Sequence, residues 1–529
     1  MGRHTGDYLV GTTVLAVAML FAISQGKSQT MLSQPSERSS VSRMLHASRW
    51  TSTSASSLQR PVANTSLQPA HAVLKNLSRG TRIVVGSLDV FGGRHTLAVA
   101  VCGDYPVRIG SLPVARCSID DIRRWGNEKN LHNSVACDVL TPEGLPVSGV
   151  CSQGPHASFA RVFLTPHFID NGTMHEATEC RFIGESRRVH VYVDHRLVKT
   201  TGSEQVKAWS EPLTSAVELR ALPIVDAWIG AISDVDHDQK LSIVVTDLDR
   251  RRRRASEIPP IHGCIRETDF RSDSDFCGDI VYIDPNVFEL PTAELAALLS
   301  HEIAHAAICS MRADRSIDAA ADPAEFGSQP AGLQVPSWLN EAVAHFVELQ
   351  CGDADVGAAG MSENFRRRLD DFLANPACSP IVAAEDVLSL EERRSGSRGA
   401  ATLFLARWFS SSKALEQFLR SPATLDRQIE DLAQEPFADV FRDWTLSLAT
   451  MSATQAATSG ENQMLHTDRL PVAGSNTRFP LLGTGFRCFE CSEDVGTLII
   501  ESDDAARLQI TIIEPEAHIT TMANAATQN

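Results

Sequence analysis

Two apolar segments near the middle of the chain carry the strongest helical pattern. In 290–308 apolar residues cover most of the circumference of a helix, and in 338–347 they recur at helical spacing. Among the polar residues that interrupt these runs are His301, Glu302, His305, Glu341 and His345. Because charged groups are rarely kept inside a purely structural core, we expect these five residues to carry chemistry.

Short runs of β-branched and apolar residues, bounded by turn residues, dominate the region before these helices. The clearest are Ile83–Val85, Leu97–Val101, Arg161–Leu164 and Val189–Val193. Two similar runs near the end of the chain are Thr497–Ile500 and Leu508–Ile513. The pattern therefore predicts a β-rich N-terminal domain over 79–205 and a small β-rich C-terminal region over 477–529.

The segment 206–450 mixes both patterns, and we assign it to one catalytic domain. A helix is expected at Ala216–Ile232, with Pro223 at its start or at a kink, followed by a strand at Ser242–Val245. Ile280–Asp284 is typical of an edge strand that leads into the first apolar helix. Later helices are expected at Phe365–Leu373, Gly399–Ser410, Lys413–Leu419 and Phe437–Ala449. The predicted fold class is α+β.

Polar stretches without periodicity separate these parts. The range 26–78 is rich in Ser, Thr, Gln and Pro and predicts a disordered linker, and 451–476 predicts a second one. An apolar run at 8–24 follows basic residues and indicates a signal peptide within 1–25, with an uncleaved membrane anchor as the alternative. We therefore expect a secreted or periplasmic protein that contacts a membrane only through this segment.

Cysteine content and charge add to this picture. An even number of cysteines, twelve, behind a signal sequence favours disulfides. The formal net charge of −17 argues against a general nucleic-acid binder. A hydrophobic content of 43% is enough for sizeable cores.

The first apolar helix contains the pattern H-E-x-x-H at 301–305. This spacing puts His301 and His305 one helical turn apart, so that both imidazoles face one point. H-E-x-x-H is a zinc-binding motif, in which the two histidines ligate the ion. Glu302 lies one residue round the helix, where it can reach a water bound to the zinc without ligating the zinc itself. A catalytic zinc site needs a third protein ligand and one open position. Glu341, early in the second apolar helix, is the candidate for that third ligand.

The H-E-I-A-H motif and the W-L-N-E segment of 338–341 together resemble the gluzincin metallopeptidases, most closely over 290–350. The resemblance implies a zincin-like catalytic domain with a mostly helical lower lobe and a cleft between two lobes. It implies a Zn²⁺ ion, a peptide or protein substrate, and Glu302 as general base. The metal ligands that it implies are His301, His305 and Glu341.

The sequence departs from the gluzincin pattern at three points. Ala342 replaces the usual glycine, and His345 stands where thermolysin-like members carry an aspartate that orients a ligand histidine. Gluzincins also place a tyrosine or histidine beyond the glutamate ligand to stabilise the oxyanion, and no tyrosine follows the motif here. The remaining candidates for this role include His345, Arg398, His466 and His518.

We assign His345 to the catalytic residues, with two alternative roles. It either orients a metal ligand or donates a hydrogen bond to the oxyanion. Asn340 and Glu348 are candidates for residues that hydrogen-bond to the metal ligands and orient them. The alternative for Glu348 is an exposed position on the surface of the helix.

Two other functions remain open from the sequence. One is a catalytically inactive zincin-fold protein that binds a partner, and the other is a zinc hydrolase acting on a non-peptide amide or ester. A separate motif, 234–239, resembles the start of a calcium-binding loop, but Gln239 stands where an EF-hand needs glycine and no glutamate follows at the twelfth position. We interpret this stretch as a solvated turn, with a calcium site as the alternative.

Overall fold

The computed structural model describes residues 71–102, 114–118, 160–169, 172–249, 261–271, 276–321, 335–351, 362–383, 395–409, 411–421, 423–459, 465–502 and 507–515. The predicted signal segment 1–25 and most of the predicted linker 26–78 lie outside these residues. Among the described helices, none combines the length and the apolar character needed to cross a bilayer.

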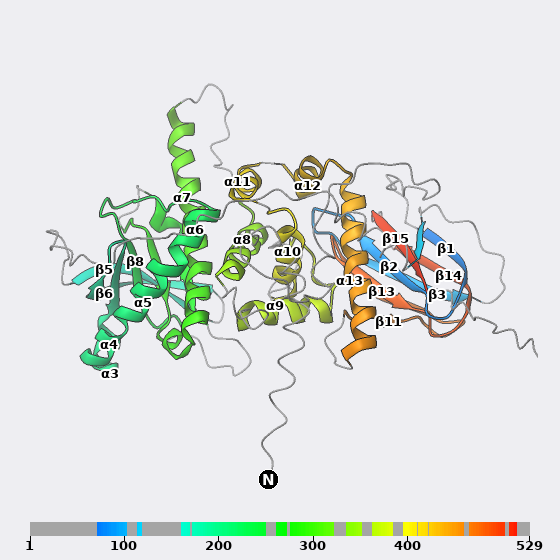
Figure 1. Ribbon diagram of the computed structural model, residues 1–529, viewed down its shortest axis with the longest axis horizontal. Coiled ribbons are helices and arrows are strands. Elements are labelled where there is room, and N and C mark those ends of the chain that lie inside the picture. The colour runs from blue at the N-terminus through cyan, green and yellow to red at the C-terminus, as the bar shows by residue number, and fades with distance from the viewer. Residues whose placement is uncertain are drawn as a thin grey trace, which may run out of the picture.

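The chain has an α+β fold with three sheets, one at one end of the molecule and two at the other (Figure 1). The six-stranded sheet has the order β5 (Ala160–Ile169), β6 (Gly172–Glu185), β7 (Val189–Asp194), β8 (Leu241–Val245), β10 (Ile280–Ile283) and β9 (Gly263–Ile265). Strands β7, β8 and β10 run parallel. Their residues are all buried, as expected for parallel strands covered on both faces.

The edge of this sheet differs from the prediction. Ile280–Asp284 was expected at the edge, but β9 pairs antiparallel with β10 on its outer side, with Tyr282 opposite Cys264. The edge strand β9 has the sequence Gly-Cys-Ile. Three residues are too few to give a strand pattern in the sequence, so the prediction stopped one strand short.

Helices cover one face of the six-stranded sheet. They are α3 (His195–Thr201), α4 (Ser203–Ala208), α5 (Ser210–Ala216), α6 (Leu222–Trp228) and the 30-residue α7 (Thr292–Ala321). A π-helical turn, Val217–Ala221, joins α5 to α6 just before Pro223. The proline lacks a donor N–H, and the irregular turn accommodates it where the sequence predicted a start or kink.

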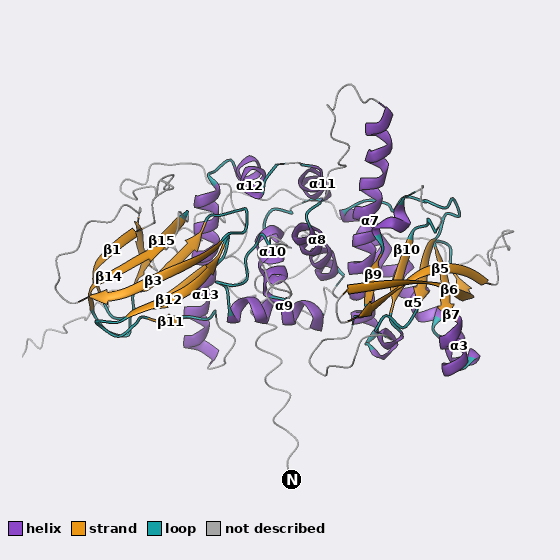
Figure 2. Ribbon diagram, turned by 180° about the vertical axis from the view of Figure 1, so that it is seen from behind, coloured by secondary structure: helices purple, strands orange, loops and turns teal. Residues whose placement is uncertain are grey.

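A group of shorter helices lies between the six-stranded sheet and the other two sheets (Figure 2). They are α8 (Ser337–Gln350), α9 (Glu363–Ala374), α10 (Gly396–Ala406), α11 (Ser412–Arg420), α12 (Leu425–Ala433) and α13 (Phe437–Ser459). Helix α13 continues through the start of the predicted linker 451–476. That stretch has no apolar periodicity, but it is rich in alanine and lacks glycine and proline, so nothing in it ends the helix.

The two remaining sheets face each other across a shared apolar core and form a β-sandwich. One has the order β1 (His71–Leu77), β14 (Val495–Ser502), β3 (Arg94–Cys102) and β12 (Asn476–Leu482). The other has the order β11 (Asp468–Arg469), β13 (Phe486–Glu490), β2 (Arg82–Ser87), β15 (Leu508–Glu514) and β4 (Val114–Ser118).

The sandwich corrects the predicted grouping of the strands. The strands expected within 79–205 are divided between the sandwich and the six-stranded sheet, and those of 477–529 interleave with β1–β4. Strand β1 also lies inside the range expected to be a linker, 26–78. An alternating pattern shows that a segment is a strand, but it does not show which partner the strand takes.

The helical part packs directly on the sandwich through α13. A Cβ built on Gly86 of β2 would lie 2.6 Å from the ring of Phe441, so the absence of a side chain there lets the ring approach the strand. Phe441 and Trp444 belong to the same buried cluster as the strands β7, β8 and β10. One continuous core therefore runs from the sandwich through the helices to the six-stranded sheet.

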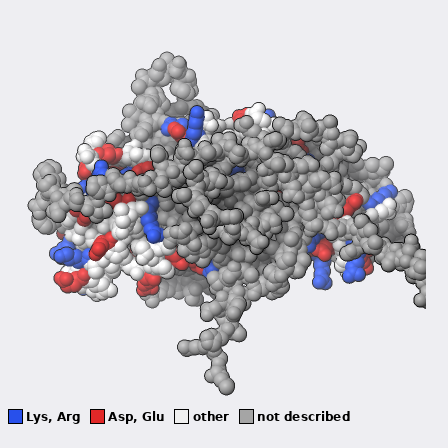
Figure 3. Space-filling view, viewed as in Figure 1, with Lys and Arg blue, Asp and Glu red and all other residues white. Residues whose placement is uncertain are grey.

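Charges of both signs are interspersed on the surface at the end of the molecule that contains the six-stranded sheet (Figure 3). Ion pairs join neighbouring elements there, among them Arg196 with Glu176 and Arg188 with Asp226.

Cys488 and Cys491 are buried free thiols, and burial raises the pKa of each to about 11. The disulfides and the exclusion of nucleic acid stay predictions.

Candidate metal centre

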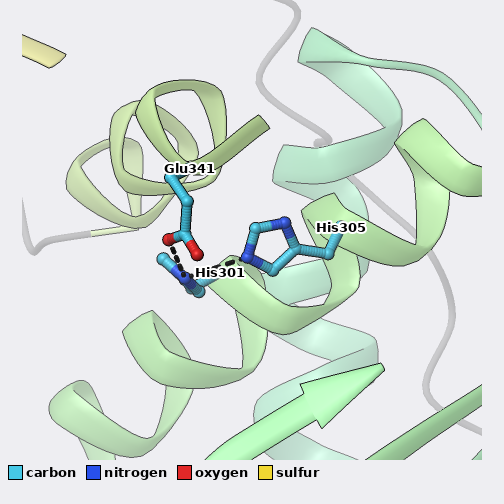
Figure 4. Close-up of side chains that lie close together, drawn as sticks. All are labelled: His301, His305 and Glu341. Carbon is cyan, nitrogen blue, oxygen red and sulfur yellow. Dashed lines mark hydrogen bonds and ion pairs between the residues drawn. The ribbon is translucent and has the colours of Figure 1, made fainter. Parts of the chain in front are cut away.

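Helix α7 brings its two motif histidines together at the middle of the molecule. The Nε2 atoms of His301 and His305 lie 3.2 Å apart, and both side chains are buried. Glu341 of α8 points at the same place, with its Oε2 atom 3.8 Å from Nε2 of His301 (Figure 4). These three side chains form a group that can hold a metal ion.

The local sequence explains why these helices meet at this place. Helix α7 is apolar on nearly every side between Leu295 and Cys309, so it is buried between the six-stranded sheet and α8. Helix α8 begins just after Pro336 and buries Leu339, Val343 and Phe346. The ligating side chains are thus held by helices whose other faces are fixed in the core.

The hydrogen bonds of the two imidazoles fix their tautomers. Nδ1 of His301 lies 3.0 Å from the carboxylate Oε2 of Glu348, and Nδ1 of His305 lies 2.9 Å from the amide Oδ1 of Asn340. Both partners are acceptors, so each Nδ1 carries the proton and each Nε2 presents a lone pair.

Three acceptors therefore converge without a donor between them. The two Nε2 lone pairs face each other, and Oε2 of Glu341 is buried without a hydrogen-bond partner among the described residues. Such an arrangement is unfavourable in a buried site unless a cation lies between the acceptors. The geometry and the donor set therefore fit a bound metal ion.

Glu348 lies behind the ligands and is held by donors on both carboxylate oxygens. Oε2 accepts from Nδ1 of His301 and from Nδ1 of His345 at 2.7 Å, and Oε1 accepts from the hydroxyl of Ser362, which also caps α9. Burial would raise the pKa of Glu348, but His345 and His301 outweigh it and lower the pKa. Glu348 is thus a permanent carboxylate beneath His301.

His345 lies on the Nδ1 side of His301, away from the metal-binding Nε2 atoms. It is fully buried, and its ring centroid is 4.5 Å from that of His301. Of its two expected roles, this position supports orientation of a ligand, because His345 holds Glu348 and Glu348 holds His301. The carboxylate that contacts His301 therefore belongs to Glu348 and not to position 345, where the resemblance implied an aspartate.

His345, His301 and Glu348 also form a group that could hold a metal ion. In that group, however, the Glu348 carboxylate already accepts from both imidazoles and from Ser362. The His301–His305–Glu341 group is the better site because its facing atoms have no donor.

Arg398 of α10 holds the third ligand. Its Nη2 lies 2.9 Å from Oε1 of Glu341, which leaves Oε2 free to face the histidines. Burial would raise the pKa of Glu341, but Arg398, followed by His305, outweighs it and lowers the pKa to about 2. The sequence analysis named Arg398 as an oxyanion candidate, and the structure places it on a ligand.

Glu302 is buried beside the edge strand β9. A Cβ built on Gly263 would lie 2.7 Å from Cγ and 2.9 Å from Oε1 of Glu302. Burial, followed by the charges of Glu341 and Glu348, raises the pKa of Glu302 to about 8. Gly263 was missed by the sequence analysis, because its importance comes from a contact between segments distant in the chain.

Of the other oxyanion candidates, His466 does not join this group. His466 is exposed after α13 and bonds Asp468 at 3.2 Å, and His518 lies outside the described residues. Tyr282 precedes the motif in the sequence, and its hydroxyl already donates a hydrogen bond to the buried carboxyl group of Asp269 at 2.9 Å.

No protein-family model and no curated protein matches this chain.

Proposed function

We propose that this protein is an exported zinc metallopeptidase with a zincin-like fold of the gluzincin type. The observation that carries the proposal is the convergence of three buried acceptors, from His301, His305 and Glu341, with a second carboxyl group, that of Glu302, buried nearby. The six-stranded sheet with α7 corresponds to the upper lobe, and α8 to α13 correspond to the lower lobe.

Zinc is the metal that this donor set favours. Two imidazole nitrogens and one carboxylate oxygen form the three-ligand arrangement typical of catalytic zinc. The carboxylate of Glu348 and the amide of Asn340 bond the remaining ring nitrogens, as acceptors behind zinc-binding histidines usually do. Zinc, when bound, supplies Lewis acidity that polarises a substrate carbonyl and acidifies a coordinated water.

The protein groups supply the proton transfers. Burial and the charges of Glu341 and Glu348 raise the pKa of Glu302 to about 8, and a metal cation held beside it would lower that pKa again, because a nearby positive charge favours the carboxylate. As a carboxylate, Glu302 would accept the proton of the attacking water and then deliver it to the leaving amine. His305 stays neutral because burial, followed by the nearby His301, lowers its pKa to about 4, so its Nε2 remains a ligand at neutral pH.

The edge strand β9 supports a peptide as the substrate. β9 ends the six-stranded sheet, and its Gly263 touches Glu302. An extended peptide that pairs with a sheet edge by strand addition would lie next to the general base. Export is supported by the apolar segment 8–24.

The test is Glu302→Gln in the full-length protein, measured for zinc content and for hydrolysis of a mixed peptide library. The amide keeps the shape of the side chain but cannot accept the proton. Zinc and folding should stay at the parent level while turnover falls by roughly 10²–10⁴-fold. Glu341→Ala serves as the contrast, because it should lose metal and activity together.

Two results would replace the proposal. A parent protein that binds zinc and hydrolyses no peptide, ester or amide would be an inactive zincin-fold binding protein. The lack of a tyrosine donor at the described metal centre favours that alternative. A protein that hydrolyses amides or esters but no peptides would be a non-peptidase zinc hydrolase.

A further inference from the structure

A second group of potential metal ligands lies beside the starts of two neighbouring strands of the six-stranded sheet, β8 and β10, and shares no residue with the His301–His305–Glu341 group. It consists of Asp234, Asp236, Asp238 and Asp279, whose ligand oxygens all lie within 4.8 Å of one another. The first three precede β8, and the last precedes β10. Strands β8 and β10 are parallel neighbours, with Ser242 opposite Ile280. The segments that precede the two strands therefore meet at the same end of the sheet, where both strands begin.

Asp279 gives an observation independent of this clustering. Its side chain is 5% exposed, and its Oδ1 atom has no hydrogen-bond partner among the described residues. Buried Oδ1 atoms of Asp234 and Asp236 also have none. A buried carboxylate oxygen without a donor or cation is strongly disfavoured, and here three occur in one group.

Hydrogen-bond and ion-pair partners contact other carboxylate oxygens of the group, those of Asp238 and Oδ2 of Asp236. Arg161 pairs with Oδ2 of Asp236 at 2.8 Å, and the backbone N–H of Lys240 bonds Oδ1 of Asp238 at 2.8 Å. Nδ1 of His190 lies 3.3 Å from Oδ2 of Asp238. One guanidinium cannot balance four acidic groups: burial and the charges of Asp236, Asp238 and Asp234 raise the pKa of Asp279 to about 8 in the empty site, and a divalent cation would favour its carboxylate form.

We propose that this group binds Ca²⁺. All of the atoms that could ligate a metal in this group are carboxylate oxygens, the ligand type that calcium prefers. No imidazole or thiolate belongs to the group. The alternating acidic residues at 234, 236 and 238 supply ligands from one turn, and Asp279 supplies another from a distant segment. Asp279 thereby takes the place of the acidic ligand whose absence from the sequence led us to interpret 234–239 as a solvated turn.

The ion would tie the turn before β8 to the start of β10. β10 pairs with the edge strand β9. Calcium at this place would therefore stabilise the sheet that supports the metal centre, without touching the metal centre itself. The proposal does not depend on the peptidase function, and its test measures binding and thermal stability instead of hydrolysis.

The experiment is a calcium titration of the full-length protein by calorimetry, after calcium removal and with the zinc site kept loaded. It is paired with thermal unfolding at increasing CaCl₂. We expect one calcium per chain and a rise in Tm of at least about 2 °C at saturation. Asp279→Asn should weaken calcium affinity by at least about tenfold, because it removes a charged, buried ligand.

A matched control is Asp226→Asn, which changes an aspartate of α6 that pairs with Arg188 outside the group. It should respond to calcium like the parent. If Asp279→Asn does not fold, Asp234→Asn tests the same site from a more exposed position. Failure of the parent to bind calcium, or equal calcium affinity in the parent and the ligand variants, would overturn the proposal, as would a preference for Mg²⁺ over Ca²⁺.

Discussion

At the scale of single residues, the metal centre is defined by which atoms donate and which accept. The spacing of His301 and His305 and the place of Glu341 early in an apolar helix are local features, and the sequence alone predicted that these side chains would meet. Glu348 and Asn340 lie on the same helix as Glu341, so helical periodicity also indicated them. Gly263, Arg398 and Asp279 act through contacts with distant segments, for which a single sequence carries no signal.

His345 offers a prediction that separates its two roles. As the residue that holds Glu348, it acts on His301 through a hydrogen-bonded carboxylate. His345→Ala should weaken zinc affinity by about 10–100-fold, while the zinc-saturated variant should keep most of its kcat. The measurement is zinc affinity by chelator competition, together with kcat at saturating zinc.

The oxyanion role makes the opposite prediction for the same variant. A lost oxyanion donor would lower kcat by roughly 10²–10³-fold and leave zinc affinity unchanged. His345→Asn, whose amide retains a donor for Glu348, should recover part of the zinc affinity if His345 acts by orientation.

At the scale of elements, helices and strands with long apolar patterns were predictable, and their irregular or short parts were not. Helices α9, α11 and α13 overlap the ranges predicted from periodicity. The three-residue strand β9 gave no pattern, and α13 extends beyond its apolar stripe into an alanine-rich segment. Element boundaries depend on capping and tertiary contacts that periodicity does not report.

The contact between β9 and α7 gives a prediction for Gly263→Ala. The new Cβ would lie within 3 Å of three atoms of the Glu302 side chain, and this side chain can move more easily than a backbone. We expect Glu302 to be displaced, with hydrolysis reduced on the order of 10–100-fold and zinc content unchanged. Gly496→Ala in β14, where an added Cβ meets no atom within 4 Å, is the matched control and should keep full activity. Parent-like kinetics of Gly263→Ala would argue against Glu302 as the general base.

A buried carboxyl at the end of β10 predicts a pH dependence of stability. Asp284 is 2% exposed and accepts from the backbone N–H groups of Asn286 and Leu248, at 3.0 and 3.1 Å. Burial outweighs these hydrogen bonds and raises its pKa from an ordinary value of 3.8 to about 6. The folded protein therefore keeps the proton at pH values where the unfolded chain has lost it.

The sign follows from that difference. Below pH 4 the side chain is protonated in both states, and as the pH rises through 6 the folded state must bury a charge. The free energy of unfolding should therefore fall with rising pH, on the order of 2–3 kcal/mol between pH 4 and 7. Asp284→Asn carries no titrating group and should lose this part of the slope in unfolding measured across that range. Parallel pH profiles of parent and variant would contradict the assignment.

At the scale of the whole molecule, segments from both ends of the described chain build the same sandwich. The sequence identified four of these strands, β2, β3, β14 and β15, but it assigned them to separate regions, because hydrophobic alternation contains no information about partners. In the two sheets, none of β1, β2, β3 and β4 neighbours another of these four. Among the described strands, each of them pairs only with strands that come after α13.

This interleaving predicts the result of a truncation after residue 464. If 477–529 were an independent appendage, the shortened chain would keep its fold and its metal. In the sandwich, however, the truncation removes every strand partner of β1–β4 and also β15, whose Gln509 donates to the backbone of Ala438 in α13. Unpaired strands with buried apolar faces cannot hold their structure in water. We expect the truncated protein to be insoluble or rapidly proteolysed, and co-expression of 465–529 as a separate chain should restore soluble, zinc-binding protein by strand pairing. A truncated chain that is soluble and binds zinc without the added segment would show that the sandwich is not needed to hold the metal centre together.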